Sequence, residues 1–182
     1  AKFKLHDYFF AKTIDSVRPG GLLVFVTSRY TMDKQHTRAR KYLAERADFL
    51  GAIRLPQTAF RDNAGTDVVT DVIFLRKKIP GQNTGGEDWT TLAPLTTKDG
   101  DVQVNEYFVA HPEMILGQPR LTGNTDDQGR RINGLHPGDL TVVSYDASAE
   151  DLEAKFSQAV GNLPSNIYSM AGQDANTLRG AT

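Results

Sequence analysis

Three apolar runs in the first part of the chain constrain the fold more than any other feature of the sequence. Residues 22–27 form a continuous apolar run, and residues 49–55 and 68–75 form two more that are rich in β-branched side chains. A continuous run of this kind is typical of a strand that is buried on both faces of a sheet. Apolar residues at helical spacing occupy residues 3–17 and 34–47, so helices precede and follow the first run.

The resulting order of helix, strand, helix, strand and strand predicts an α/β fold. Strands that alternate with helices indicate an open, mostly parallel sheet. The last two strands are joined without a predicted helix, by residues 57–67, and therefore predict an antiparallel hairpin at the edge of that sheet. A loop of about ten residues without structure of its own is commonly functional.

A turn-rich segment at residues 80–86 divides the chain where its charge changes sign. Residues 1–80 hold 15 Lys and Arg against 8 Asp and Glu, a net charge of +7, whereas residues 81–182 hold 6 against 14, a net charge of −8. We therefore expect an α/β domain in residues 1–80, an acidic α+β extension in residues 81–168 and a flexible tail in residues 169–182.

The extension has its own pattern of elements. The sequence predicts a strand at residues 89–95, a helix at 105–116, a polar loop at 117–134 and a strand at 139–145. Ser148 and Asp151 form a capping box for a last helix, which is expected to bury Leu152, Phe156, Ala159 and Val160.

The composition excludes several kinds of site. The chain has no Cys, and its four His are scattered without the spacing of a metal site, so neither a disulfide nor a metal centre is expected. No apolar run approaches the roughly 20 residues that span a bilayer, so we expect a soluble, cytoplasmic protein without a membrane partner. The basic first part either faces a polyanion such as nucleic acid or is an ordinary solvated surface.

Three motifs stand in order between residues 3 and 78. Residues 15–28 read DSVRPGGLLVFVTS, residues 51–56 read GAIRLP and are followed by Ala59 and Phe60, and residues 70–76 read TDVIFLR. Together they resemble the second half of the class I adenine-specific DNA methyltransferases. In that family a Pro-Gly-Gly turn leads into the fifth strand of the sheet, and the other motifs form the closing antiparallel strands. The resemblance implies a partial Rossmann-like methyltransferase sheet with an antiparallel edge hairpin, followed by a small α+β segment.

A narrower resemblance reaches into the extension. Residues 28–33 (SRYTMD), 64–71 (AGTDVVTD) and 104–114 (VNEYFVAHPEM) look like segments of the large methylase-helicase proteins of bacterial mobile elements and phages. The family's catalytic Asn/Asp-Pro-Pro-Phe/Tyr signature and its glycine-rich cofactor turn do not occur in this sequence. The resemblance therefore implies a fragment without catalytic or cofactor-binding residues, which is inactive by itself and binds no cofactor tightly.

The resemblance also implies the partners. In the complete protein, the methyl group would pass from S-adenosylmethionine to the adenine amino group of DNA, and the upstream half of the domain would complete the site. The alternative is a non-enzymatic DNA-binding or scaffold module of a larger helicase/methylase protein. An RNA or protein substrate also stays open.

Residues near the strand ends are the candidates for a site. Ligands of open α/β sheets bind at the carboxyl ends of the strands, which residues 27–32 and 60–70 can reach. The candidate substrate- and DNA-binding residues are Arg29, Tyr30, Phe60, Arg61 and Thr66. The arginines could hold phosphates and the aromatic rings could wall a flipped base, although ordinary packing or solvation explains each of them as well. Asp71 lies within a strand with Val and Ile flanking it, so we expect it to cap or order the hairpin rather than to act as a base.

Half of a sheet would expose an edge and an apolar face. Such surfaces favour self-association unless something covers them. We therefore expect either a homodimer or close packing of residues 85–165 on the sheet.

Overall fold

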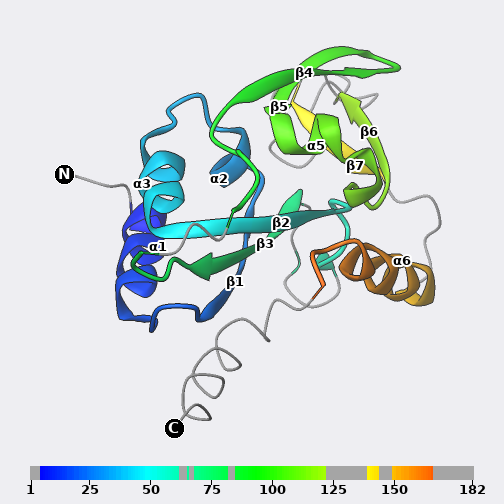
Figure 1. Ribbon diagram of the computed structural model, residues 1–182. Helices are drawn as coiled ribbons and strands as arrows, with labels where there is room; N and C mark the ends of the chain where they lie inside the picture. The colour runs from blue at the N-terminus through cyan, green and yellow to red at the C-terminus, as the bar shows by residue number, and fades with distance from the viewer. Residues whose placement is uncertain are drawn as a thin grey trace, which may run out of the picture.

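A three-stranded sheet lies at the centre of the molecule, with the strand order β1-β3-β2. The computed structural model describes residues 5–61, 65, 68–81, 85–121, 139–143 and 149–165, and Figure 1 shows their arrangement. The first part of the chain contains α1 (Leu5–Ser16), β1 (Leu22–Ser28), α2 (Tyr30–Asp33), α3 (Arg38–Arg46), β2 (Ala47–Leu55) and β3 (Thr70–Lys77). These elements confirm the predicted α/β fold, and α2 is an addition to the predicted order.

The central strand of the sheet is β3, which is antiparallel to both of its neighbours. The predicted antiparallel hairpin is present as β2 and β3, with β2 at the edge of the described sheet. The expectation of a mostly parallel sheet is wrong for these strands, because β1 and β2 run in the same direction but are separated by β3. β3 is buried along almost its whole length, as expected for a central strand, and β2 is buried throughout because the extension covers it as well.

The two faces of β1 are covered differently. On one face, Phe25 packs against α1, where its ring centroid lies 4.3 Å from that of Phe10, and Leu23 is buried beside it. On the other face, Val24 and Val26 are 49% and 61% exposed. The prediction that this strand is buried on both faces is therefore wrong, because one face of β1 stays open to solvent.

Two lysines at the end of β3 hold the ends of two helices. The Nζ atom of Lys77 donates to the carbonyl oxygen of Ile14 in the last turn of α1, and that of Lys78 donates to the carbonyl oxygen of Ala44 in the last turn of α3, both at 2.6 Å. Carbonyls in the last turn of a helix lack intrahelical partners, and a cation there also favours the helix dipole. These basic residues thus attach both helices to the sheet.

The described residues of the extension form two antiparallel strand pairs and three helical segments, at the upper and lower right of Figure 1. They are β4 (Leu92–Thr97), β5 (Gly100–Asn105), α5 (Glu106–Ala110), η1 (Pro112–Met114), β6 (Gln118–Leu121), β7 (Leu140–Val143) and α6 (Ala149–Gly161). β4 pairs with β5, and β6 pairs with β7, both antiparallel. None of the described helices is long and apolar enough to cross a membrane.

Several predictions for the extension are corrected by these elements. The strand β5 was not predicted, and β6 lies within the predicted polar loop. The predicted helix at residues 105–116 is split at His111, because Pro112 cannot donate a hydrogen bond to continue α5. The remainder of that loop and the predicted tail lie outside the described residues, as does Ser148.

The last helix packs much as its pattern predicts. Ala159 is buried, and Leu152 and Phe156 are half-buried against the core. Val160 is 40% exposed, so its predicted burial is wrong. A helix can bury only one stripe, and α6 directs Ala159 rather than Val160 inward.

Residues of the extension seal the outer edge of β2. The backbone N–H of Leu116 donates to the carbonyl of Arg54 at 2.8 Å, and that of Glu87 donates to the carbonyl of Phe49 at 3.3 Å. Trp89 is 1% exposed and stacks on Phe49, with ring centroids 4.9 Å apart and planes inclined by 12°. The predicted packing of the extension on the sheet is therefore confirmed at β2.

The two parts of the chain approach each other closely at Gly51. This residue follows a register shift in β2 and has a φ of 142°, a conformation that glycine adopts readily. A Cβ atom there would lie 2.8 Å from the hydroxyl oxygen of Tyr107 and 2.5 Å from Leu163. Tyr107 also packs edge-on against Phe49, so α5 rests directly on the sheet.

The hydroxyl of Tyr107 gives the packing of α5 a measurable pH dependence. Burial raises the pKa of Tyr107 from 10.0 to about 12, and the backbone of Ala52 offsets this only in part. The unfolded chain loses this proton near pH 10 whereas the folded chain retains it, so the free energy of unfolding should fall between about pH 10 and 12. Urea unfolding at several pH values should show a smaller fall for Tyr107→Phe. Identical pH dependences would contradict this.

Candidate functional site

The expected site lies where the three strands of the central sheet end together. The last residues of β1 and β2, Ser28 and Leu55, both pair with Thr70, the first residue of β3. Arg29 and Tyr30 follow β1 directly, and the backbone N–H of Arg29 donates to the carbonyl of Val69 at 3.0 Å. This end of the sheet corresponds to the carboxyl ends of β1 and β2, where α/β folds bind ligands.

A buried guanidinium organises this end of the sheet. Arg54 on β2 is fully buried and donates two hydrogen bonds to Asp71 on β3, from Nε to Oδ1 at 2.7 Å and from Nη2 to Oδ2 at 2.8 Å. The same Nη2 donates to Oδ1 of Asp33 on α2 at 2.9 Å. The bidentate geometry matches the planar fork of arginine to the carboxylate and fixes the register of β2 on β3.

The buried charges of Arg54 and Asp71 stabilise each other in the interior. Burial raises the pKa of Asp71, and the hydrogen bonds from Arg54 oppose this effect. Burial alone would lower the pKa of Arg54, but Asp71 and Asp33 outweigh it and raise the pKa above its ordinary value. The predicted role of Asp71 in ordering the hairpin is therefore confirmed.

The same cluster binds the extension to the sheet. The backbone N–H of Asn105 donates to Oδ1 of Asp33 at 2.9 Å, and the Asn105 amide donates to the carbonyls of Met32 at 3.0 Å and Trp89 at 2.7 Å. The Arg54 guanidinium lies 4.1 Å from the ring centroid of Phe108 on α5. Polar groups of α2, β2 and the extension are thus joined in one buried hydrogen-bonded cluster.

A second buried arginine also joins the first part of the chain to the extension. Arg40 on α3 is 1% exposed and donates to the carbonyl of Thr90 at 3.2 and 3.3 Å and to the carbonyl of Thr31 at 3.3 Å. Burial lowers the pKa of Arg40, and the nearby Asp33 carboxylate opposes this. Arg40 therefore links α3 to α2 through Thr31 and to the extension through Thr90.

The predicted candidate Arg29 points inward. Its Nη2 donates to Oδ1 of Asp139 at 3.2 Å, and its Nη1 lies 3.6 Å from Oδ2 of Asp33, within ion-pair but beyond hydrogen-bond distance. Arg29 is 7% exposed. In this conformation its charge is neutralised by carboxylates of the chain itself.

The other candidates occupy different environments. Tyr30 is 50% exposed beside Arg29, whereas Phe60 is half-buried against the hydrophobic core. Arg61 is exposed, and its backbone N–H donates to the carbonyl of Thr58 at 3.0 Å. Thr66 lies outside the described residues. The structure thus brings Arg29 and Tyr30 together, while the roles of all five residues stay predictions.

Arg54, Asp33 and Asn105 were not predicted as members of this cluster. Arg54 and Asp71 did carry a recognisable pattern, since each is a single charge within an apolar strand. A single charge in a buried strand needs a partner of opposite charge, and each of these two predicted strands holds one such charge. Asn105 had no such pattern because its partners are Met32 and Asp33 on α2, far away in the sequence, and the backbone of Trp89.

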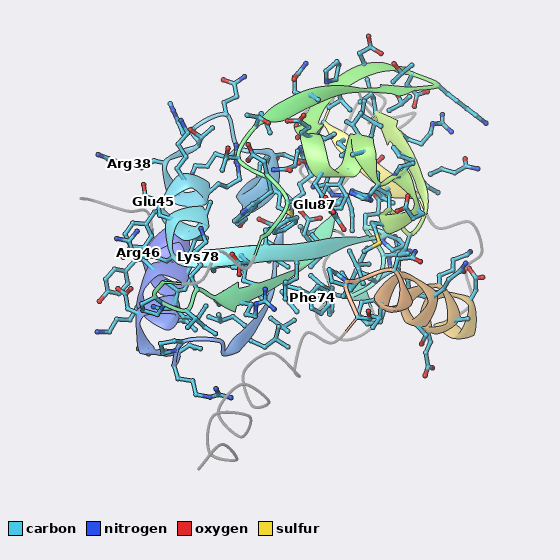
Figure 2. All side chains as sticks on the ribbon, in the orientation of Figure 1. Arg38, Glu45, Arg46, Phe74, Lys78 and Glu87 are labelled. Carbon is cyan, nitrogen blue, oxygen red and sulfur yellow. The ribbon has the colours of Figure 1, made fainter. Side chains whose placement is uncertain are left out.

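Several basic residues of the first part lie on or beside α3. Figure 2 shows Arg38, Arg46 and Lys78 at this end of the molecule. The Arg46 guanidinium lies 3.6 Å from the ring centroid of Tyr42, and Lys78 holds the end of α3, so both have structural partners. Arg46 and Lys78 therefore help to stabilise α3.

Comparisons with known proteins give limited likenesses. No family model matches the chain. The protein named "Defense against restriction protein B" of Escherichia phage P1 is 39% identical over 72 residues, which are 39% of this chain and 3% of that protein. The matched segment is thus a small part of the relative's length. A solved protein of Listeria monocytogenes, described as a class I S-adenosylmethionine-dependent methyltransferase, is 22% identical with a TM-score of 0.38, over 45% of this chain and 24% of that one. This distant likeness carries no argument about function.

Breaking the buried pair should be costly. Asp71→Asn removes the charge but retains the shape, so Arg54 is left buried with one carboxylate fewer, and the free energy of unfolding should fall by about 3–5 kcal/mol. Urea unfolding followed by Trp89 fluorescence measures this loss, because Trp89 is buried at the junction of the two parts.

The matched control is Asp99→Asn. Asp99 accepts two hydrogen bonds from Arg120, at 2.6 and 3.0 Å, but this pair is exposed to solvent. An exposed pair contributes little because water screens it. If both variants lost the same amount of unfolding free energy, burial would not increase the contribution of the Arg54–Asp71 pair, contrary to this prediction.

Proposed function

We propose that this chain is the distal part of a methyltransferase domain within a larger protein, which transfers methyl groups from S-adenosylmethionine to the adenine amino group of DNA. The observation that carries the proposal is the sheet, in which β3 is inserted antiparallel between the parallel strands β1 and β2. The motifs in these strands resemble those of the fifth strand and the closing strands of adenine-specific methyltransferases. The fold thus agrees with the resemblance at the level of individual strands.

The open side of β1 supports the proposal. Among the described strands β1 pairs only with β3, and Val24 and Val26 remain exposed on one of its faces. An edge strand with exposed apolar side chains is an aggregation hazard unless another segment covers it. We assign the upstream half of the domain, with its catalytic loop and cofactor turn, to this edge.

Two observations support DNA as the substrate. The phage relative is named for defence against restriction, a process directed at DNA. The first part of this chain has an excess of basic residues, with 15 Lys and Arg against 8 Asp and Glu in residues 1–80, which favours a polyanionic partner.

The role of this chain in the reaction is positioning. Asp33 and Asp71 at the strand end do not suit a cofactor site, because both carboxylates are bonded to Arg54. S-Adenosylmethionine would supply the methyl group from a site in the upstream half. The present residues would fix the strand end through Arg54 and present Tyr30 toward the substrate.

A scaffold function is the second candidate. Arg29, Arg40 and Arg54 lie among Asp33, Asp71 and Asp139, so the charges at the strand end largely neutralise one another. Such internal pairing suits a module that holds neighbouring domains in place. Enzymatic assays distinguish the two candidates.

The full-length protein encoded by the gene should transfer labelled methyl groups from S-adenosylmethionine to adenine in duplex DNA. The isolated 182-residue chain should not. Scintillation counting and chromatography of the digested DNA measure the product. Transfer to RNA or to protein glutamine would replace the DNA substrate, and binding of DNA without any transfer would favour the scaffold.

Lysines on the open face of β1 should prevent completion of the domain. Val24→Lys with Val26→Lys should abolish methyl transfer by the full-length protein, because charged side chains would meet the upstream half. The isolated chain should lose no more than about 1 kcal/mol of unfolding free energy, since both sites are exposed. Val143→Lys, at a residue on β7 that is 46% exposed, is the control and should leave transfer unchanged. Full activity of the double variant would refute the assigned interface.

A further inference from the structure

We propose that Arg29 and Tyr30 form a nucleotide-binding subsite, in which Tyr30 stacks on a nucleobase and Arg29 binds the neighbouring phosphate in place of Asp139. This inference rests on the proposed function, because it names the groups of the nucleic acid that the strand end would hold. It follows from the geometry of the two side chains and from the position of Asp139.

The two side chains form one anchored unit at the end of β1. The Cζ atom of Arg29 lies 4.4 Å from the ring centroid of Tyr30, and Nη2 lies 3.4 Å from the tyrosine hydroxyl, to which it donates. The bond from the Arg29 backbone to Val69 attaches this unit to the start of β3. Tyr30 is therefore held in place although half of it is exposed. An aromatic ring that is already ordered loses little entropy when a base stacks on it.

The two carboxylates around Arg29 differ in their access to solvent. The side chain of Asp33 is 1% exposed and is bonded to Arg54 and to the backbone of Asn105. The side chain of Asp139 is 22% exposed. Asp139 is therefore the carboxylate that an incoming anion can displace, while Asp33 continues to hold Arg29 from within.

A phosphodiester oxygen suits the position that Asp139 occupies. Like a carboxylate, it is an anionic acceptor that matches the planar guanidinium. The exchange costs the ion pair between Arg29 and Asp139, so a bare phosphate gains little from it. A nucleotide gains the stacking on Tyr30 as well. The site thus selects a phosphate that is attached to a base over a simple anion.

The first test removes the competing carboxylate. In the 182-residue chain, Asp139→Asn should bind a labelled single-stranded oligonucleotide about tenfold more tightly at low salt, because Arg29 becomes available for a charged hydrogen bond. The slope of log affinity against log salt should steepen by about 0.7, the increment for one further phosphate contact on a single strand. Fluorescence anisotropy at several KCl concentrations measures both.

Two further variants decide whether Arg29 causes the gain. Asp99→Asn makes the same change in net charge at the exposed pair with Arg120, and it should leave the affinity near that of the unmodified chain. Arg29→Gln combined with Asp139→Asn should lose the gain, with the fold checked by Trp89 emission. A gain that persists without Arg29, or that Asp99→Asn reproduces, would overturn the proposal.

The second test concerns the base and does not alter a buried residue. Tyr30→Ala should weaken binding of the ordinary oligonucleotide about tenfold but leave binding of an abasic oligonucleotide of equal length unchanged. Tyr30→Phe should retain both affinities. An equal loss on the abasic strand would refute stacking. Duplex DNA, single-stranded DNA and single-stranded RNA are compared in parallel to identify the source of the nucleotide. Because methyl transfer is not measured, failure of these tests is distinct from failure of the proposed function.

Discussion

The bidentate ion pair between Arg54 and Asp71 is the interaction on which the rest of the structure depends. It joins β2 to β3 in the interior, where an unpaired charge would cost several kcal/mol. Any shift of one strand by a single residue would separate the two side chains and turn them to opposite faces of the sheet. Through Asp33 the same guanidinium also fixes α2, and through Phe108 it contacts the extension. The Arg54 side chain thus contacts β3, α2 and α5 at the same time.

The two edges of the central sheet have opposite characters. The edge at β2 is sealed by the extension, which supplies backbone donors from Glu87 and Leu116 and packs Trp89 on Phe49. The side of the sheet at β1 keeps exposed valines on one face. Sealing one edge satisfies backbone groups that would otherwise pair with another chain. This asymmetry is the reason for proposing that the upstream half of the domain packs at β1 and not at β2.

The strand end combines a neutralised interior with a boundary that faces solvent. The inner pairs give the site rigidity, because their partners come from β2, β3, α2 and the extension. At the boundary, Arg29 connects the interior to Tyr30 and Asp139, which are the more exposed members of the group. A ligand that exchanges with Asp139 would therefore meet a preorganised surface without disturbing the pairs behind it.

The sequence by itself determined the α/β class, the hairpin of β2 and β3, and the ordering role of Asp71, because apolar runs and lone charges report burial locally. It also located Arg29 and Tyr30 at a strand end. Only the tertiary structure decided that β3 lies between β1 and β2, that Val24 and Val26 stay open, and that Arg29 turns inward to Asp33 and Asp139. The strand order and the pairing of Arg29 depend on contacts between residues from separate elements, which no local pattern encodes.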